Sequence, residues 1–176
     1  MTLTLPANRR TGHVIVGLDR LTSPRWRGKT SSGRAVADRT LGRRFSHDAA
    51  ISDPVYLYTD DVIAILPERN LNNGQPSLHA ALIAAAAPQP GEHVVHVGAG
   101  VGYYRRFSRS WSASRGRVTA IEFDAELAAR ATANLAQTPH VRAIHGDDTR
   151  LMFEPTDIIY VNAGATRSAD AWLGFP

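Results

Sequence analysis

The chain has 176 residues, of which 43% are hydrophobic and 20% are charged, a composition typical of one globular domain with or without an appended arm. It contains no cysteine, which excludes a disulfide framework and a thiolate metal site. No apolar run approaches the roughly 18 residues needed to cross a bilayer, and nothing at the N-terminus resembles a signal peptide. We therefore expect a cytoplasmic protein with no membrane partner and no metal.

The formal net charge of +4 is concentrated in two basic segments. Ten of the 20 Lys and Arg residues lie in residues 1–50, and five more lie in residues 105–117. A basic arm can contact phosphate backbones. No aromatic or helical pattern accompanies this charge, which favours a solvated, poorly ordered leader over residues 1–47 and makes a nucleic-acid partner unlikely. Within it only the run 13–16 has the composition of a strand, and we place the domain over residues 48–176.

The first part of the domain contains short apolar runs, a polar loop and a helix. Residues 55–58 and 62–66 have the composition of extended segments, and residues 67–74 form a polar loop with three asparagines. Pro76 suits the first turn of a helix. We predict that helix over residues 77–87, with His79 in its first turn and Pro88 as its end.

A glycine-rich loop after a buried strand is the strongest motif of the chain. Residues 94–97 are a β-branched run too short for a helix, and Gly98, Gly100 and Gly102 follow at once. Glycines there let the chain turn sharply and let its backbone approach a ligand. Glu122 ends a second such run about 20 residues later, the spacing at which a carboxylate reaches the ribose of a nucleoside.

The rest of the chain alternates between strands and helices, with one interruption. A helix should follow the glycine loop, but residues 105–113 carry Ser and Arg where Ala and Leu are expected. Asp124 is a good N-cap for a helix reaching about Ala136, with Leu127, Ala131 and Leu135 on its buried face. Further strands are predicted over 141–145 and 157–161. Polar residues follow each strand, as in a doubly wound sheet whose strand ends open onto one crevice.

Two kinds of nucleotide-binding site are also considered for the glycine loop and Glu122. A dinucleotide site shares the glycine loop and the ribose acid, and it is the main rival on these features. A nucleoside triphosphatase is disfavoured because no Gly-Lys-Ser/Thr follows the glycines.

Four motifs together resemble class I S-adenosylmethionine-dependent methyltransferases, and more narrowly the protein-L-isoaspartate O-methyltransferase family. The resemblance covers roughly residues 51–173. Its pieces are GQPSLHA at residues 74–80, PGEHVVHVGAGVGY at 90–103, VTAIE at 118–122 and HGD at 145–147.

The resemblance implies a Rossmann-like, doubly wound, mostly parallel α/β sheet and S-adenosyl-L-methionine as cofactor. It implies that the glycines wrap the methionine portion, that Glu122 holds the ribose and that Asp147 and Asp148 flank the adenine. His79 matches a family histidine near the cofactor. The implied cofactor residues are Asn73, Gly74, His79, Gly98, Ala99, Gly100, Gly102, Glu122, Asp147 and Asp148, and Asn162 is the implied substrate residue.

Four departures accompany the resemblance, one of which is the interrupted helix after the glycine loop. His96 stands where the first motif usually has an acid, and Gly74 replaces the family's substrate-contacting serine, which bears on isoaspartyl activity specifically. The chain also ends at Pro176, whereas the family continues with three more strands. An incomplete sheet would leave the fourth strand as an apolar, unpaired edge, and such an edge promotes association.

We therefore expect methyl transfer from S-adenosylmethionine to a protein carboxyl group or a small acceptor, with no catalytic acid or base identified. Methyl transfer is an in-line displacement that depends mostly on positioning, so no strong acid–base pair is required. Two alternatives stay open. One is a truncated, non-catalytic remnant that at most binds the cofactor, and the other is a nucleic-acid-directed methyltransferase that uses the basic segments.

Overall fold

The computed structural model describes residues 14–17, 60, 62–104, 116–152, 154–164 and 168–173. The predicted extended run 55–58, the interrupted segment 105–113 and most of the basic segment 1–47 lie outside the described residues. Among the helices that are described, none has both the length and the apolar character that a membrane crossing requires.

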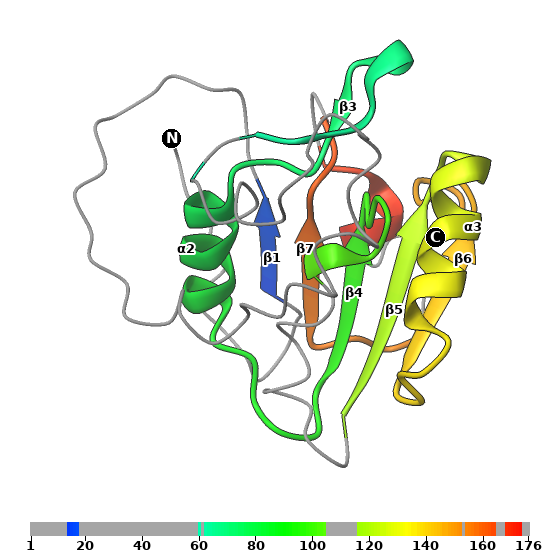
Figure 1. The fold of residues 1–176 in the computed structure, drawn as a ribbon. Helices are drawn as coiled ribbons and strands as arrows, with labels where there is room; N and C mark the ends of the chain where they lie inside the picture. Colours follow the sequence, from blue (N-terminus) through cyan, green and yellow to red (C-terminus); the bar gives the residue numbers. More distant parts are fainter. Residues whose placement is uncertain are drawn as a thin grey trace.

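A five-stranded parallel sheet forms the centre of the molecule, in the order β1-β7-β4-β5-β6 (Figure 1). Its four later strands confirm the sequence predictions because each is a short run rich in β-branched residues. They are β4 (His93–Val97), β5 (Arg117–Glu122), β6 (Val141–His145) and β7 (Ile158–Val161).

Two helices pack on one face of this sheet. The helix α2 (Pro76–Ala86) buries Leu82 and Ile83 against Val94 and Tyr160, and α3 (Ala125–Leu135) buries Leu135 against the β5 side. Both helices match their predictions to within one residue at each end. The predicted cap of α3 is confirmed, since the Asp124 carboxylate accepts hydrogen bonds from two backbone N–H groups of the first turn at 3.0 Å.

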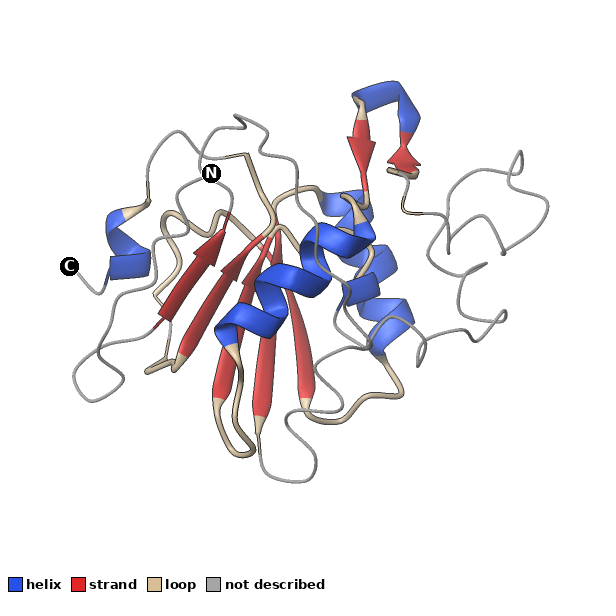
Figure 2. Ribbon diagram, turned by 90° about the vertical axis from the view of Figure 1, so that its left-hand side faces the viewer, coloured by secondary structure: helices blue, strands red, loops and turns tan. Residues whose placement is uncertain are grey.

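In the described part of the chain, a turn of 3₁₀ helix, η5 (Asp170–Leu173), packs on the opposite face, on the side of the sheet away from α3 (Figure 2). Successive side chains of a strand point to opposite faces, so Val95 and Val97 face this turn while Val94 faces α2. Trp172 is buried against Val95 and Val97, and its indole N–H donates to Asp148 at 3.1 Å.

One expectation about the sheet edge is wrong. The strand β1 (Val14–Gly17) pairs in parallel with β7, from Val14 opposite Ile158 to Gly17 opposite Val161, so β7 is not an unpaired edge. A buried apolar strand with unpaired N–H and C=O groups is costly. The β-branched run near the N-terminus satisfies those groups, and the sheet therefore includes a strand from the segment that we expected to be poorly ordered.

The predicted polar loop before α2 is a small hairpin. The strands β2 (Ala64–Leu66) and β3 (Leu71–Asn72) are antiparallel and are joined by a 3₁₀ turn, η3 (Pro67–Arg69). Asn70 closes the turn in the left-handed conformation, at φ 54°, which asparagine tolerates better than most residues. In Figure 1 the hairpin projects beyond the carboxyl ends of the sheet strands.

Candidate cofactor site

A cavity of about 220 Å³ lies at the carboxyl ends of β4, β5 and β7, beside the β2–β3 hairpin. This is the end of a parallel sheet at which doubly wound folds bind ligands. The lining consists of the glycine loop 98–101, residues 71–73 and Ile65 of the hairpin region, Tyr103, Tyr104, Glu122, Leu127 and residues 162–164 after β7.

The glycine loop brings β4 into close contact with β7. Gly98 has φ +70°, and a Cβ on it would stand 2.5 Å from the carbonyl oxygen of Asn162, so only glycine fits there. The backbone N–H of Asn162 donates in turn to the carbonyl of Val97 at 2.8 Å. Gly98, Ala99 and Gly100 line the cavity. Gly102 does not line it, since it lies against Leu135 of α3.

Glu122 connects the glycine loop to α3. One carboxylate oxygen accepts a hydrogen bond from the N–H of Gly100 at 2.7 Å, and the other accepts from the N–H of Asp124 at 2.9 Å. The side chain is buried, which raises the pKa of Glu122 although backbone donors oppose that shift. A carboxylate has about four acceptor positions, so this group retains acceptors toward the cavity.

Asn73 closes the base of the hairpin. Its side-chain oxygen accepts from the N–H of Ile63 at 2.7 Å, and its own N–H donates to the carbonyl of Ile63 at 2.9 Å. The residue is buried and lines the cavity, and its amide nitrogen carries two further donors. Asn162 lines the cavity from the opposite side, after β7.

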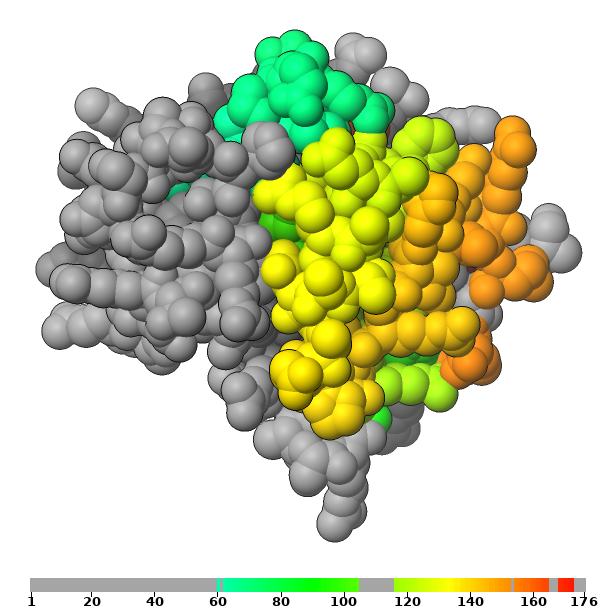
Figure 3. Space-filling view, turned by 45° about the vertical axis from the view of Figure 1, so that its right-hand side comes forward, coloured from blue at the N-terminus to red at the C-terminus, as the bar shows by residue number. Residues whose placement is uncertain are grey.

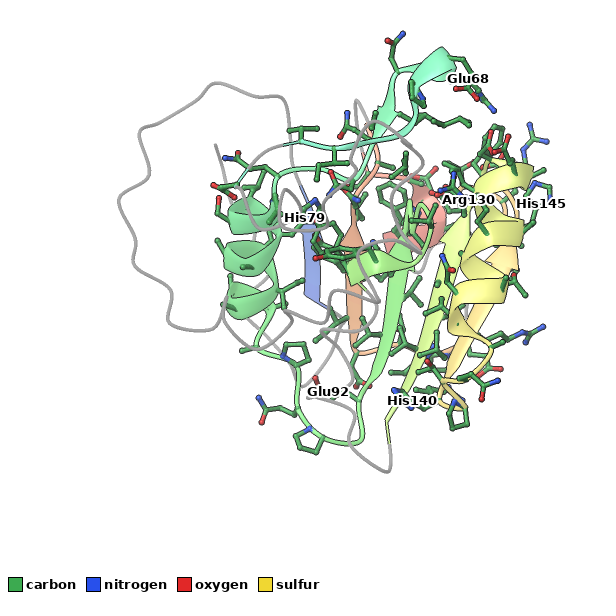
Figure 4. The ribbon with its side chains drawn as sticks, in the orientation of Figure 1. Glu68, His79, Glu92, Arg130, His140 and His145 are labelled. Carbon is green, nitrogen blue, oxygen red and sulfur yellow. The ribbon has the colours of Figure 1, made fainter. Side chains whose placement is uncertain are left out.

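His79 lies behind the cavity and is not part of its lining. Its ring is buried between α2 and the sheet (Figure 4), stacks on Tyr104 with centroids 3.8 Å apart, and shares a hydrogen bond through Nδ1 with the Tyr160 hydroxyl. Burial lowers the pKa of His79 to about 4, so the imidazole is neutral at pH 7. Tyr104 does line the cavity, and His79 therefore supports it from behind.

The two acidic residues after β6 are engaged elsewhere and do not line the cavity. Asp147 accepts from the N–H and the hydroxyl of Thr149 at 3.0 and 2.6 Å, and these bonds hold the pKa of Asp147 below its ordinary value. Asp148 accepts from Trp172, and burial raises the pKa of Asp148. The charge of Asp148 also contributes to the raised pKa of Glu122.

Of the charged side chains in the described part of the chain, only that of Glu122 lines the cavity. A phosphate-binding site would present Lys, Arg or several convergent N–H groups. Within the described residues, no group of three His, Asp or Glu side chains is placed to hold a metal ion. The cavity therefore suits a neutral or cationic ligand that carries hydroxyl donors.

Residues 43–174 match the family model described as protein-L-isoaspartate(D-aspartate) O-methyltransferase. The chain belongs to this family. The predicted resemblance is thereby confirmed. No curated protein sequence matches the chain.

Two solved structures confirm the predicted Rossmann-like fold. A protein-L-isoaspartate O-methyltransferase superposes with a TM-score of 0.65 at 23% identity, over 73% of this chain and 42% of that one. A putative protein-L-isoaspartate O-methyltransferase from Plasmodium falciparum, solved with S-adenosyl-L-homocysteine, has a TM-score of 0.59 at 18% identity, over 73% and 64%. The chain thus spans less than two thirds of the length of either relative.

In this structure the backbone and the surroundings of Gly74 disfavour any side chain at that position. Gly74 has φ +70°, and a Cβ there would overlap Nε2 of His79. The hydroxyl of Tyr104 donates to the Gly74 carbonyl at 3.3 Å, so both rings lie against this glycine. Gly74 itself does not line the cavity.

The structure therefore brings six of the eleven predicted site residues into the cavity wall and leaves five outside it. Sequence reasoning missed the tyrosines directly after the glycine loop and the apolar residues Ile65, Leu71 and Leu127, whose pattern is that of ordinary core residues. The available signal for Tyr103 was an aromatic residue directly after the last glycine of the loop.

The neutral state of His79 predicts a pH dependence of stability. Its pKa is about 4 in the folded chain and near 6.5 when unfolded, so the unfolded chain gains protons first as the pH falls. Stability is therefore full above pH 6.5 and is lost progressively toward pH 4, by about 2 kcal/mol at pH 5. The free energy of unfolding in urea should fall between pH 7.5 and pH 5 in both proteins. The fall should be smaller by that amount in His79→Gln than in the wild type. Equal changes in both proteins would contradict the assignment.

The contact between Gly74 and His79 predicts a costly substitution. Gly74→Ser should destabilise the protein by roughly 2–4 kcal/mol, from the positive φ and the clash together. Gly91→Ser is the matched control, because Gly91 has φ +94° and nothing within 4 Å of an added Cβ. Urea unfolding should show that Gly74→Ser costs clearly more than Gly91→Ser, and that the excess disappears when His79→Ala is added. An excess that persists would show that His79 is not its cause.

Proposed function

We propose that this chain binds S-adenosylmethionine in the cavity and transfers its methyl group to a carboxyl group of a protein acceptor. The observation that carries the proposal is the buried carboxylate of Glu122, which lines the cavity and holds the glycine loop in a chain of this methyltransferase family. Family membership by itself indicates a methyl acceptor that is a protein or a small molecule.

The chemistry of the lining fits this cofactor. The unused acceptor positions of Glu122 suit the two hydroxyl donors of a ribose, and the backbone at Gly98 and Gly100 allows close approach of the amino acid portion. The carboxylate and the aromatic faces of Tyr103 and Tyr104 favour a sulfonium cation, because aromatic faces attract positive charge. A phosphate group would find no counter-charge in the described lining.

The base of the nucleoside would lie beyond Glu122, next to the exposed ring of Phe123. An exposed aromatic face offers a stacking surface for a flat base. We propose that Asp147 and Asp148 flank the base from the end of β6, as the family resemblance implies. Gly74, His79 and Gly102 would support the wall of the site from behind and would not touch the cofactor.

The bound cofactor supplies an electrophilic methyl group, and the residues of this chain supply positioning. An acceptor carboxyl group is ionised at neutral pH, so it needs no general base to act as a nucleophile. We propose that the side-chain amide of Asn162, which lines the cavity at the end of β7, donates to the acceptor carboxylate and orients it. A site that only orients an ionised acceptor needs no acid–base pair, in agreement with the sequence analysis, which identified none.

Cofactor binding is tested first by calorimetric titration with S-adenosylhomocysteine, with NAD as the control ligand. The wild type should bind the former with a Kd on the order of micromolar and should not bind NAD. Glu122→Gln replaces an acceptor oxygen by a donor and should weaken binding at least about tenfold. Glu154→Gln removes an exposed carboxylate outside the lining and should leave Kd unchanged. Absence of binding by folded wild-type protein would overturn the proposal.

Transfer is tested with two peptides that differ only in an isoaspartyl or an aspartyl residue, using cofactor labelled in the methyl group. A carboxyl methyl ester is hydrolysed by base, so label transferred to the peptide should be released as methanol at high pH. We expect base-labile label on the isoaspartyl peptide, lost in Glu122→Gln. Binding of S-adenosylhomocysteine without transfer to either peptide would favour the alternative of a non-catalytic remnant.

A further inference from the structure

The β2–β3 hairpin forms one wall of the cavity and depends on the rest of the domain for its stability. Its strands have three and two residues, and a hairpin of this size is not stable in isolation. Ile65, Leu71 and Asn73 line the cavity from this side, while the four residues 67–70 at the tip are exposed. Its position must therefore be set by contacts with the body of the domain.

Two arginines make polar contacts between the hairpin and α3. Arg69, in the turn η3, forms an ion pair with Asp124, and Arg130 of α3 donates to the backbone carbonyl of Ile65 at 2.8 Å. Below these, Ile65 packs in a cluster with Leu127. Figure 3 shows the surface of the hairpin resting on that of α3, and Figure 4 shows Arg130 below the hairpin.

The partner of Arg69 is hydrogen-bonded to Glu122, which lines the cavity. Asp124 is buried, caps α3 with one carboxylate oxygen and pairs with Arg69 through the other. Its backbone N–H donates to Glu122, whose other oxygen accepts from Gly100. A continuous series of polar contacts thus runs from the exposed tip of the hairpin to the glycine loop.

The ion pair between Arg69 and Asp124 stabilises the position of the hairpin and is not needed to cap α3. Without Arg69, the Asp124 carboxylate still accepts from two N–H groups at the positive end of α3, so the helix keeps its cap. The hairpin would lose the polar contact at its tip and retain the one between Arg130 and Ile65 near its base.

We propose that Arg69 is a positioning residue of the cofactor site, which holds the hairpin wall closed through Asp124 and thereby slows release of the bound cofactor. This inference rests on the proposed function, since it assumes that the cavity binds S-adenosylmethionine. Arg69, an exposed residue outside the glycine motif, would thus influence how long the cofactor stays bound.

The experiment compares Arg69→Ala with Asp124→Asn and with the double variant. Asparagine keeps an oxygen to cap α3 but removes the negative charge. Arg117→Ala is the matched control, since Arg117 and Arg69 are both 55% exposed and each forms one ion pair, Arg117 with Glu154. Arg117 begins β5, at the end opposite to Glu122.

The rate of S-adenosylhomocysteine release is measured by stopped-flow displacement at low and high salt. Arg69→Ala and Asp124→Asn should each accelerate release roughly threefold to tenfold, and the double variant should be no faster than either, because both remove one interaction. Salt should accelerate release from the wild type and have little effect on Arg69→Ala. Rates in the two variants equal to those of the wild type and of Arg117→Ala would overturn the inference.

Hydrogen exchange of the ligand-free proteins gives a second readout that does not depend on cofactor binding. Amides of residues 64–73 should exchange faster in Arg69→Ala, while those of α3 and β4 should keep their protection. Unchanged protection of the hairpin would overturn the inference even if the wild type binds cofactor. A wild type that binds no S-adenosylhomocysteine would overturn the proposed function and with it the positioning role, whereas binding with unaltered release would overturn the positioning role alone.

Discussion

The site depends on the two hydrogen bonds that the Glu122 carboxylate accepts from the backbone. One comes from Gly100 in the loop after β4, and the other comes from Asp124 at the start of α3. A buried carboxylate is stable only where donors compensate for its lost hydration, and here the donors are the backbone N–H groups of Gly100 and Asp124. The same bonds therefore stabilise the charge, connect the loop to α3 and hold the Glu122 side chain in the wall of the cavity.

The surrounding packing explains why this carboxylate stays in place. Gly98 brings the loop against the backbone of Asn162, which joins the ends of β4 and β7. On the other side, the neutral ring of His79 fills the space beside Gly74 and supports Tyr104. Charged His79 would have to be desolvated at this position, so the ring acts as an aromatic packing element at neutral pH.

The sheet shows how the outer edge of the buried strand β7 is satisfied in this chain. The β7 strand is apolar throughout, and β1 supplies the hydrogen-bond partners along its outer edge. On the face opposite the helices, Trp172 covers valines of β4, and its polar nitrogen is satisfied by Asp148. Strand β1 and Trp172 both contact strands that are remote from them in sequence. Asn162, which directly follows β7, lines the cavity.

The sequence by itself determined the strands β4 to β7, the helices α2 and α3, the family and the central motif, because these depend on local patterns. A β-branched run before glycines and an N-cap such as Asp124 act over a few residues, and the spacing from the loop to Glu122 follows from one β-α-β unit. Only the tertiary structure decided which residues share the cavity wall: it placed Leu127 there and His79 behind it, although both lie on buried helix faces. It also decided that β1 borders β7, since strand pairing between segments more than 100 residues apart depends on which edge the rest of the fold leaves open.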